Sequence, residues 1–215
     1  SAIAALENEP TFEADVFNRF DGRINVGYTD RKNFRISRFF SFDTYKAGFD
    51  DSAYVDTDNL SVSKQKRTGG NVQWKYRKGS ITFNDNFSWI ERDISSSYPA
   101  KYDSRSYTFD AFANHKINNE IMVLAGINGN FSSFNSFTIP FGSSEFSQDV
   151  SDDVAKFDSM DPYLNFVYLS DFGLNINTGI RLNIHSTYGN HIVYNVNPSY
   201  NFDFGKNTLK VLGSY

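Results

Sequence analysis

Residues 174–185 read LNINTGIRLNIH, and this stretch decides the fold class of the chain. Apolar side chains stand at almost every second position from Leu174 to Ile184, while amide, charged or small residues fill the positions between them. In a β-strand successive side chains point to opposite faces, so the stretch predicts a strand with one apolar and one polar face.

The same period of two recurs along the whole chain, and the 3.6-residue period of an amphipathic helix is hard to find. Apolar positions are filled mainly by β-branched and aromatic residues, which favour strands. We predict about ten strands, at 12–29, 33–43, 62–76, 80–94, 104–116, 120–133, 161–169, 173–186, 191–203 and 207–215. The predicted fold class is all-β, an antiparallel up-and-down sheet.

Short and long connections alternate between the predicted strands. The tight turns, rich in Gly, Asn and Asp, are 30–32, 77–79, 118–119, 170–172 and 204–206. The longer connections are 44–61, 95–103, 134–160 and the shorter 187–190. Terse turns at one end and extended loops at the other are typical of an outer-membrane β-barrel.

A soluble β-sandwich also alternates, because it buries one face of each strand. Strands in globular proteins usually have about 5–6 residues, whereas a membrane-spanning strand needs roughly 9–11, and several segments here are longer still. The chain is 17% aromatic, and aromatic residues gather toward both ends of the strands, as in the girdles of a membrane barrel. The polar positions suit a water-filled lumen, so we expect a transmembrane barrel in the cell outer membrane, in contact with its lipid.

Composition excludes several other classes of function. The chain has no cysteine, which excludes disulfides and thiolate chemistry. A net charge of −4 and a pI near 5.3 argue against a nucleic-acid partner. No phosphate-binding, zinc-binding or nucleophile motif is present, so we expect no enzyme and no required cofactor. The one catalytic alternative is a small complete ten-stranded barrel with a rim protease, in which His185 or His191 works with Asp152 or Asp153.

Two charged residues conflict with the alternation. Arg38 and Asp85 fall on the apolar positions near the middle of their strands. An Arg that faces lipid at the middle of a bilayer costs about 2–4 kcal/mol. A bulge at Phe39 and Phe40 is one way to turn Arg38 inward.

The long connections supply the candidate site residues. Aromatic side chains there are candidates for ligand contacts: Tyr45, Phe49, Tyr54, Tyr98, Phe137 and Phe141. Four acids in one loop are candidate Ca²⁺ ligands, because Ca²⁺ prefers oxygen: Asp50, Asp51, Asp56 and Asp58. Their spacing does not match an EF-hand, and a solvated acidic loop is the alternative.

Several short motifs resemble a known family. They are Ser63-Lys-Gln-Lys-Arg67, Ile90-Glu-Arg-Asp93, Ser95-Ser-Ser-Tyr-Pro99 with Tyr102 and Ser106-Tyr107, and the final pair 194–200 and 209–215. From about Phe12 onward the chain resembles the barrel of TonB-dependent outer-membrane receptors, and most of all the cobalamin (vitamin B12) receptor-like group.

The resemblance implies a 22-stranded barrel that encloses a plug domain and is driven by the TonB complex of the inner membrane. It also implies uptake of a scarce small-molecule nutrient complex, a corrinoid or an iron chelate. This chain has about ten strands and no plug-like segment, so we expect residues 1–215 to be a partial barrel domain. A passive porin of the same architecture is the alternative function.

Overall fold

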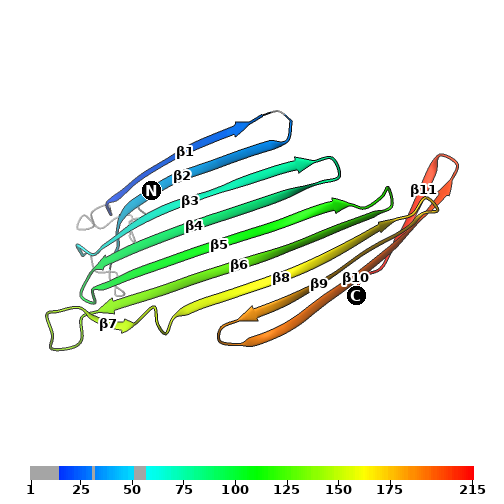
Figure 1. The fold of residues 1–215 in the computed structure, drawn as a ribbon. Coiled ribbons are helices and arrows are strands. Elements are labelled where there is room, and N and C mark those ends of the chain that lie inside the picture. The colour runs from blue at the N-terminus through cyan, green and yellow to red at the C-terminus, as the bar shows by residue number, and fades with distance from the viewer. Residues whose placement is uncertain (1–14, 31, 51–56) are drawn as a thin grey trace.

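The computed structural model describes residues 15–30, 32–50 and 57–215 of the chain. Within these residues eleven β-strands form one sheet (Figure 1), and no helix is long and apolar enough to cross a membrane. The strands are β1 (Phe17–Thr29), β2 (Phe34–Gly48), β3 (Leu60–Tyr76), β4 (Gly79–Ser95), β5 (Ala100–Lys116), β6 (Ile121–Thr138), β7 (Ser147–Val150), β8 (Lys156–Leu169), β9 (Leu174–His185), β10 (Gly189–Phe204) and β11 (Asn207–Leu212).

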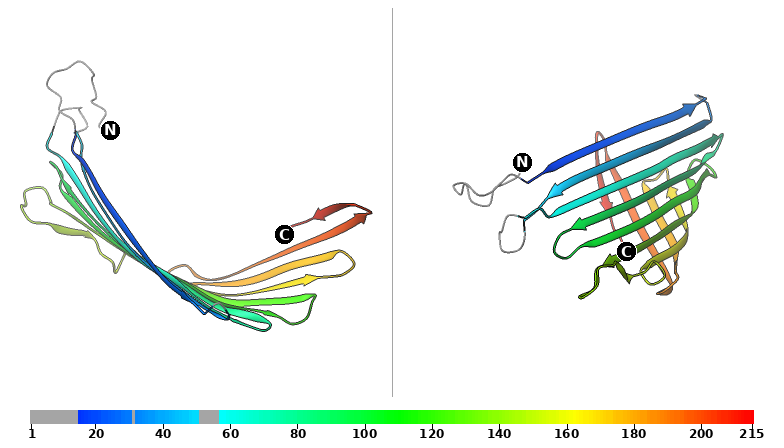
Figure 2. Two further views of the ribbon diagram at one scale, coloured as in Figure 1. Left: turned by 90° about the horizontal axis from the view of Figure 1, so that it is seen from above. Right: turned by 90° about the vertical axis from the view of Figure 1, so that its left-hand side faces the viewer.

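The sheet is an antiparallel up-and-down meander, as the alternation predicts. Each long strand pairs with its neighbours in sequence, and the short β7 pairs with the end of β6 beside the main path. Among the described residues β1 pairs only with β2, and β11 only with β10. The sheet therefore stays open as a curved trough (Figure 2), and the alternative of a ten-stranded barrel closed on itself is not the arrangement found.

The apolar face has no second layer of protein against it. Large side chains of this face, such as Ile24, Phe40, Trp74, Ile180 and Ile192, are between 49% and 68% exposed. Among the described residues the only buried apolar side chain is that of Ala100, on the other face. Leaving a large apolar side chain in water costs roughly 1.5–3 kcal/mol relative to burying it, so an exposed face of this kind needs an apolar surrounding.

The polar face is the concave one. Apart from glycines, the described residues that are buried as a whole all lie on it: Ser61, Ser63, Ser80, Thr82, Ala100 and Ser136. Side chains on this face also pair across strands, as where Asn71 Nδ2 donates to Asn84 Oδ1 at 2.6 Å. Curvature brings polar groups together on the inside and spreads the apolar side chains on the outside.

The strands continue past the apolar band at the end that carries the long connections. On the convex face of β3 and β4 the band lies between Trp74 and Trp89, and the next positions carry Lys64, Glu91 and Asp93. Backbone pairing does not stop there, because β3 and β4 remain paired up to Leu60 and Ser95. Most strands consequently extend further than predicted at this end, and the long connections shrink to 49–59, 96–99, 139–155 and 186–188.

The tight turns lie at the opposite end of the sheet (Figure 1), and side-chain acceptors hold two of them, at Asp30 and at Asn118. Asp30 Oδ1 accepts the backbone N–H groups of Lys32, Asn33 and Phe34 at 2.8–2.9 Å. Donation from the backbone N–H groups, that of Phe34 first, lowers the pKa of the exposed Asp30 carboxyl below its ordinary value. Asn118 Oδ1 organises the β5–β6 turn in the same way.

Candidate functional site

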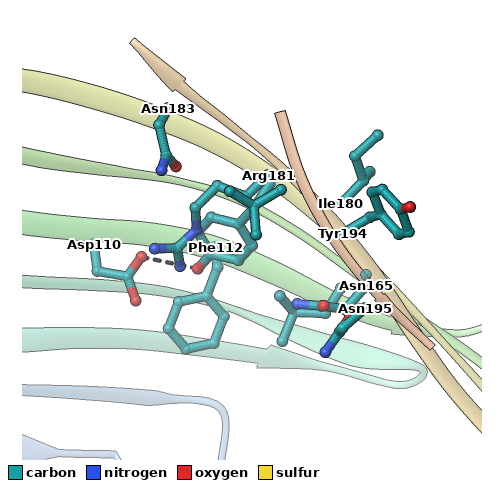
Figure 3. A pocket seen from close by; sticks show the side chains of 12 residues that line it. Asp110, Phe112, Asn165, Ile180, Arg181, Asn183, Tyr194 and Asn195 are labelled. Carbon is teal, nitrogen blue, oxygen red and sulfur yellow. Dashed lines mark hydrogen bonds between the residues drawn. The ribbon is translucent and has the colours of Figure 1, made fainter. Parts of the chain in front are cut away.

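The concave face holds the strongest candidate for a binding site. A depression of about 590 Å³ opens on it, where strands β5, β6, β8, β9 and β10 run side by side (Figure 3). Its polar lining includes Asp110, Tyr163, Asn165, Arg181, Asn183 and Asn195. These residues come from four strands, and the register of the sheet brings them together.

A hydrogen bond across one strand forms part of this lining. Tyr163 Oη on β8 donates to Asp110 Oδ1 on β5 at 2.8 Å, although β6 runs between the two strands. Gly126 on β6 makes the bond possible, because a Cβ there would lie 2.5 Å from Tyr163 Cζ and 2.7 Å from Phe112 Cβ. The missing side chain lets the tyrosine ring lie across β6.

Arg181 supplies an open positive charge in the same depression. Its guanidinium lies over the Tyr163 ring, 5.3 Å from the centroid, and the side chain is exposed. No carboxylate within the described part of the chain forms an ion pair with it. A guanidinium beside three asparagine amides can bind an anionic group and hydrogen-bond the polar atoms around it.

Two acceptor atoms, one in the lining of the depression and one beside it, have no hydrogen-bond partner within the described residues. Asp161 Oδ1 and Asn183 Oδ1 are both buried atoms of this kind. Asp161 lies next to Asn128 in the row that also contains Asp110. Buried acceptors without a protein partner are usually satisfied by water or by a bound polar group.

The predicted aromatic contacts do not gather in one place. Tyr45 lies half-buried on the concave face near the end of β2, and Phe49 follows it just beyond the strand. Tyr98 and Phe141 are exposed in separate connections, and Phe137 lies on the convex face opposite Lys101. Tyr54 lies outside the described residues. None of the described five lines the concave depression, so their part in ligand binding stays a prediction.

The calcium prediction also remains open. Asp50 and Asp58 are described, whereas Asp51 and Asp56 lie outside the described residues. In the described part of the chain no three acidic, histidine or cysteine side chains are close enough together to hold a metal ion.

The two histidines of the rim-protease alternative stabilise a turn. His185 Nδ1 accepts the backbone N–H groups of Thr187 and Tyr188 at 2.9 and 3.1 Å, and its ring packs against Phe157 and Tyr188. His191 Nε2 lies 3.1 Å from the carbonyl of Tyr188. Within the described residues neither ring contacts Asp152 or Asp153 by a hydrogen bond or ion pair.

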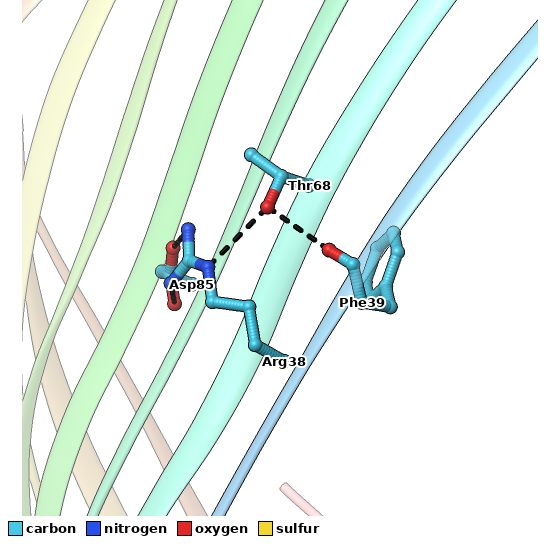
Figure 4. Close-up of polar contacts among 4 residues, drawn as sticks. All are labelled: Arg38, Phe39, Thr68 and Asp85. Carbon is cyan, nitrogen blue, oxygen red and sulfur yellow. Dashed lines mark hydrogen bonds and ion pairs between the residues drawn. The ribbon is translucent and has the colours of Figure 1, made fainter. Parts of the chain in front are cut away.

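Arg38 and Asp85, the two charged residues at apolar positions, form an ion pair with each other. The predicted bulge at Phe39 and Phe40 is wrong, because β2 keeps an unbroken register with β1 and with β3. Both side chains stay on the convex face and meet (Figure 4), with two N···O distances of 2.9 Å. Gly70 of β3 is the residue that faces both of them in the sheet. Arg38 Nε also donates to Thr68 Oγ1 at 3.3 Å, so the charges neutralise each other within the apolar band.

Sequence reasoning missed the concave depression. Asp110, Tyr163 and Arg181 are far apart in the sequence and converge only through the pairing of β5, β6, β8 and β9. The available signal was the pair of glycines, Gly126 and Gly179, on the polar side of otherwise regular strands, since glycine inside a strand often marks a close approach.

Among the comparisons with known proteins, a solved structure of a peptide importer supports the fold. No protein-family model matches the chain, and no curated protein matches it. A chain of the RagAB peptide importer, solved in its "open-open" state, superimposes with a TM-score of 0.67 and 12% identity over 88% of this chain. The translocator domain of the autotransporter NalP from Neisseria meningitidis gives a TM-score of 0.40 and 9% identity, over 94% of this chain and 74% of that domain.

The chain spans 30% of the length of the importer chain. At this level of identity the likeness shows the fold, which is that of an outer-membrane β-barrel. It does not support the cobalamin receptor group in particular.

Proposed function

We propose that this chain forms part of the wall of an outer-membrane transport barrel. The observation that carries the proposal is the single-layer sheet, apolar and exposed on its convex face and polar on its concave face. In a bilayer the convex face contacts lipid tails, and the concave face lines an aqueous path. Strands of 17 and 18 residues are long enough to cross the bilayer and to continue beyond it.

The finer part of the proposal is energised uptake through the TonB complex. The sequence resemblance to TonB-dependent receptors supports it, and it gives the complete protein a plug domain inside the barrel. The sheet is open at β1 and β11, which leaves room for further strands and for a plug on the concave side. Uptake of this kind requires no covalent step by the chain, which acts by binding alone.

The side chains of the depression around Arg181 indicate which chemical groups the proposed solute carries. Corrinoids and ferric chelates carry amide, carboxylate or phosphate groups. An unpaired guanidinium next to asparagine amides matches such groups through charge-assisted hydrogen bonds. We propose that this part of the wall contacts the solute during passage.

The test uses the complete protein in bacterial cells that lack their own receptors. Uptake of radiolabelled cyanocobalamin and of ferrichrome is measured with and without a protonophore. Arg181→Gln is compared with Arg67→Gln, which removes an arginine from the same face outside the depression. We expect energised uptake of one probe, a decrease of about tenfold in its affinity in Arg181→Gln, corresponding to about 1.4 kcal/mol, and no change in Arg67→Gln.

The outcomes separate the alternatives. Accumulation that persists with the protonophore identifies a passive porin. Failure of both probes to enter cells that display the folded protein excludes both solute classes. Equal affinities in the two variants remove Arg181 from the solute path.

A further inference from the structure

A second depression lies on the convex face, at the edge of the apolar band near the long connections. It has a volume of about 470 Å³ and is lined by apolar side chains from β1, β2 and β4, with Thr68 and Lys66 of β3 along one side. Arg23, Ser41 and Arg67 also border it, but strand alternation assigns their side chains to the concave face. Its apolar lining comprises Ile24, Phe40, Phe42, Phe87 and Trp89. Gly22 helps to keep the groove open, because the nearest atom to a Cβ at that position would be 4.0 Å away.

Cationic side chains stand at the outer end of this groove. Lys66 Nζ lies 4.3 Å from the centroid of the Trp89 ring, and Arg105 lies 5.2 Å from it. Arg105 is paired with Asp103 at 3.4 Å, and the same carboxylate accepts the Trp89 indole N–H at 2.6 Å. Lys66 has no carboxylate partner among the described residues, so its charge is available to a ligand.

The remaining charges close to Lys66 do not compete for it. Lys64 and Glu91 face each other in the next row of the sheet, one step further from the apolar band. Lys66 itself faces Trp89 directly across β3 and β4. The last apolar side chain and the first free cation therefore meet at this point.

We propose that the groove is a specific site for a phosphorylated, acylated lipid of the outer leaflet. One acyl chain lies against Ile24, Phe40 and Phe87, and a phosphate of the headgroup contacts Lys66. An ammonium group is a compact charge that binds phosphate well, and the contact is strengthened next to an apolar surface. This inference rests on the proposed function only in requiring that the convex face contacts the membrane.

The site differs from the rest of the apolar band because a groove and the charge of Lys66 lie side by side. Elsewhere on this face neighbouring rings pack against one another, as Phe83, Phe109 and Phe131 do. Here a gap at Gly22, a wall of aromatic rings and an unpaired lysine coincide. The phosphate and the acyl chain are both needed for full affinity.

The test is native mass spectrometry of the complete protein, purified in mild detergent and titrated with a bis-phosphorylated lipid A. Lys66→Gln removes the cation, and Gly22→Leu fills the groove while leaving the charge in place. Lys75→Gln is the matched control, since Lys75 lies on the same strand but on the other face and at the other end. We expect lipid affinity to fall at least about tenfold in each of the first two variants and to stay unchanged in the control.

Three results would overturn the proposal. The first is equal lipid affinity in wild type and Lys66→Gln. The second is equal affinity for a dephosphorylated lipid A and for the bis-phosphorylated one, which would show that only the acyl chains are recognised. The third is displacement by millimolar inorganic phosphate, which would show a bare anion site. A heat-modifiability gel confirms that each variant is folded, and the readout is independent of transport, so the proposed function and the lipid site fail separately.

Discussion

Two polar pairs, one on each face of the sheet, each join two strands that are separated by a third strand. The pairs differ in whether a charge beside them is left without a partner. Arg38 and Asp85 on the convex face meet across β3, and Tyr163 and Asp110 on the concave face meet across β6. Gly70 faces both Arg38 and Asp85, whereas Gly126 faces Tyr163 and Phe112 and lies beside Asn128, the partner of Asp110, on the same face of β6.

The two faces differ in whether a charged side chain is left without an ion-pair partner among the described residues. On the convex face both charges are used within the protein, and the Asp85 side chain is only 7% exposed. On the concave face Arg181 adds a charge that no described carboxylate neutralises. A lipid surrounding penalises an unpaired charge by several kcal/mol, whereas an aqueous lumen tolerates it. The comparison teaches that the medium on each side decides whether a polar cluster is closed or available to a ligand.

The largest effect on stability is expected when the ion pair between Arg38 and Asp85 is broken. Asp85→Asn leaves the charge of Arg38 uncompensated within the apolar band, so we expect the free energy of unfolding to fall by about 2–4 kcal/mol. Urea unfolding of the complete barrel in lipid vesicles measures the change. Asp93→Asn is the control, because Asp93 lies on the same strand and face beyond the band, and we expect no loss there. Equal losses in the two variants would contradict a lipid-facing position for Arg38.

A smaller effect tests the two glycines. A Cβ at Gly70 would lie 2.5 Å from the backbone oxygen of Ser37 but 3.5 Å from Arg38, whereas a Cβ at Gly126 would collide with the Tyr163 ring itself. We expect Gly70→Ala and Gly126→Ala each to destabilise the barrel by about 1–3 kcal/mol, measured by the same unfolding experiment. Gly22→Ala is the control, because the nearest atom to its Cβ would be Phe20 Cε1 at 4.0 Å, an ordinary van der Waals distance.

The glycine variants should differ in their coupling to the polar pairs. Tyr163→Phe costs about 1 kcal/mol in the wild type and nothing in Gly126→Ala, because the hydrogen bond to Asp110 is already lost. Asp85→Asn keeps its full cost in Gly70→Ala. The reverse pattern of couplings would show that the pair over Gly70, and not the one over Gly126, depends on the missing side chain.

The alternation of side chains was enough to predict the sheet and the two faces, because one strand reveals its own periodicity. It could not predict where the strands end. Thr44 and Lys46 on β2 break the apolar pattern, yet both remain paired with β3, at Lys64 and Val62. Beyond the apolar band the convex face carries polar side chains, so the sequence signal disappears while the backbone pairing continues.

Contacts between side chains on different strands could not be predicted from the sequence either. Arg38 breaks the apolar pattern of β2, and its partner Asp85 lies 47 positions away on β4, a strand that does not pair with β2. Gly70 explains the contact, but only after the register of β2, β3 and β4 is known. The concave depression was missed for the same reason, since it needs the register of five strands.

The smallest effect is expected when the closed pair is removed as a whole. Arg38→Leu with Asp85→Leu takes away both charges and leaves two side chains that suit lipid contact, so we expect an unfolding free energy within about 1 kcal/mol of the wild type or above it. Thr68 keeps its hydrogen bond to the carbonyl of Phe39 in the double variant, so no polar group is left without a partner. A double-mutant cycle with the two single variants gives the coupling energy. If the double variant is as unstable as the more damaging single variant, the pair does more than neutralise two misplaced charges, and the convex face at Arg38 contacts something other than lipid.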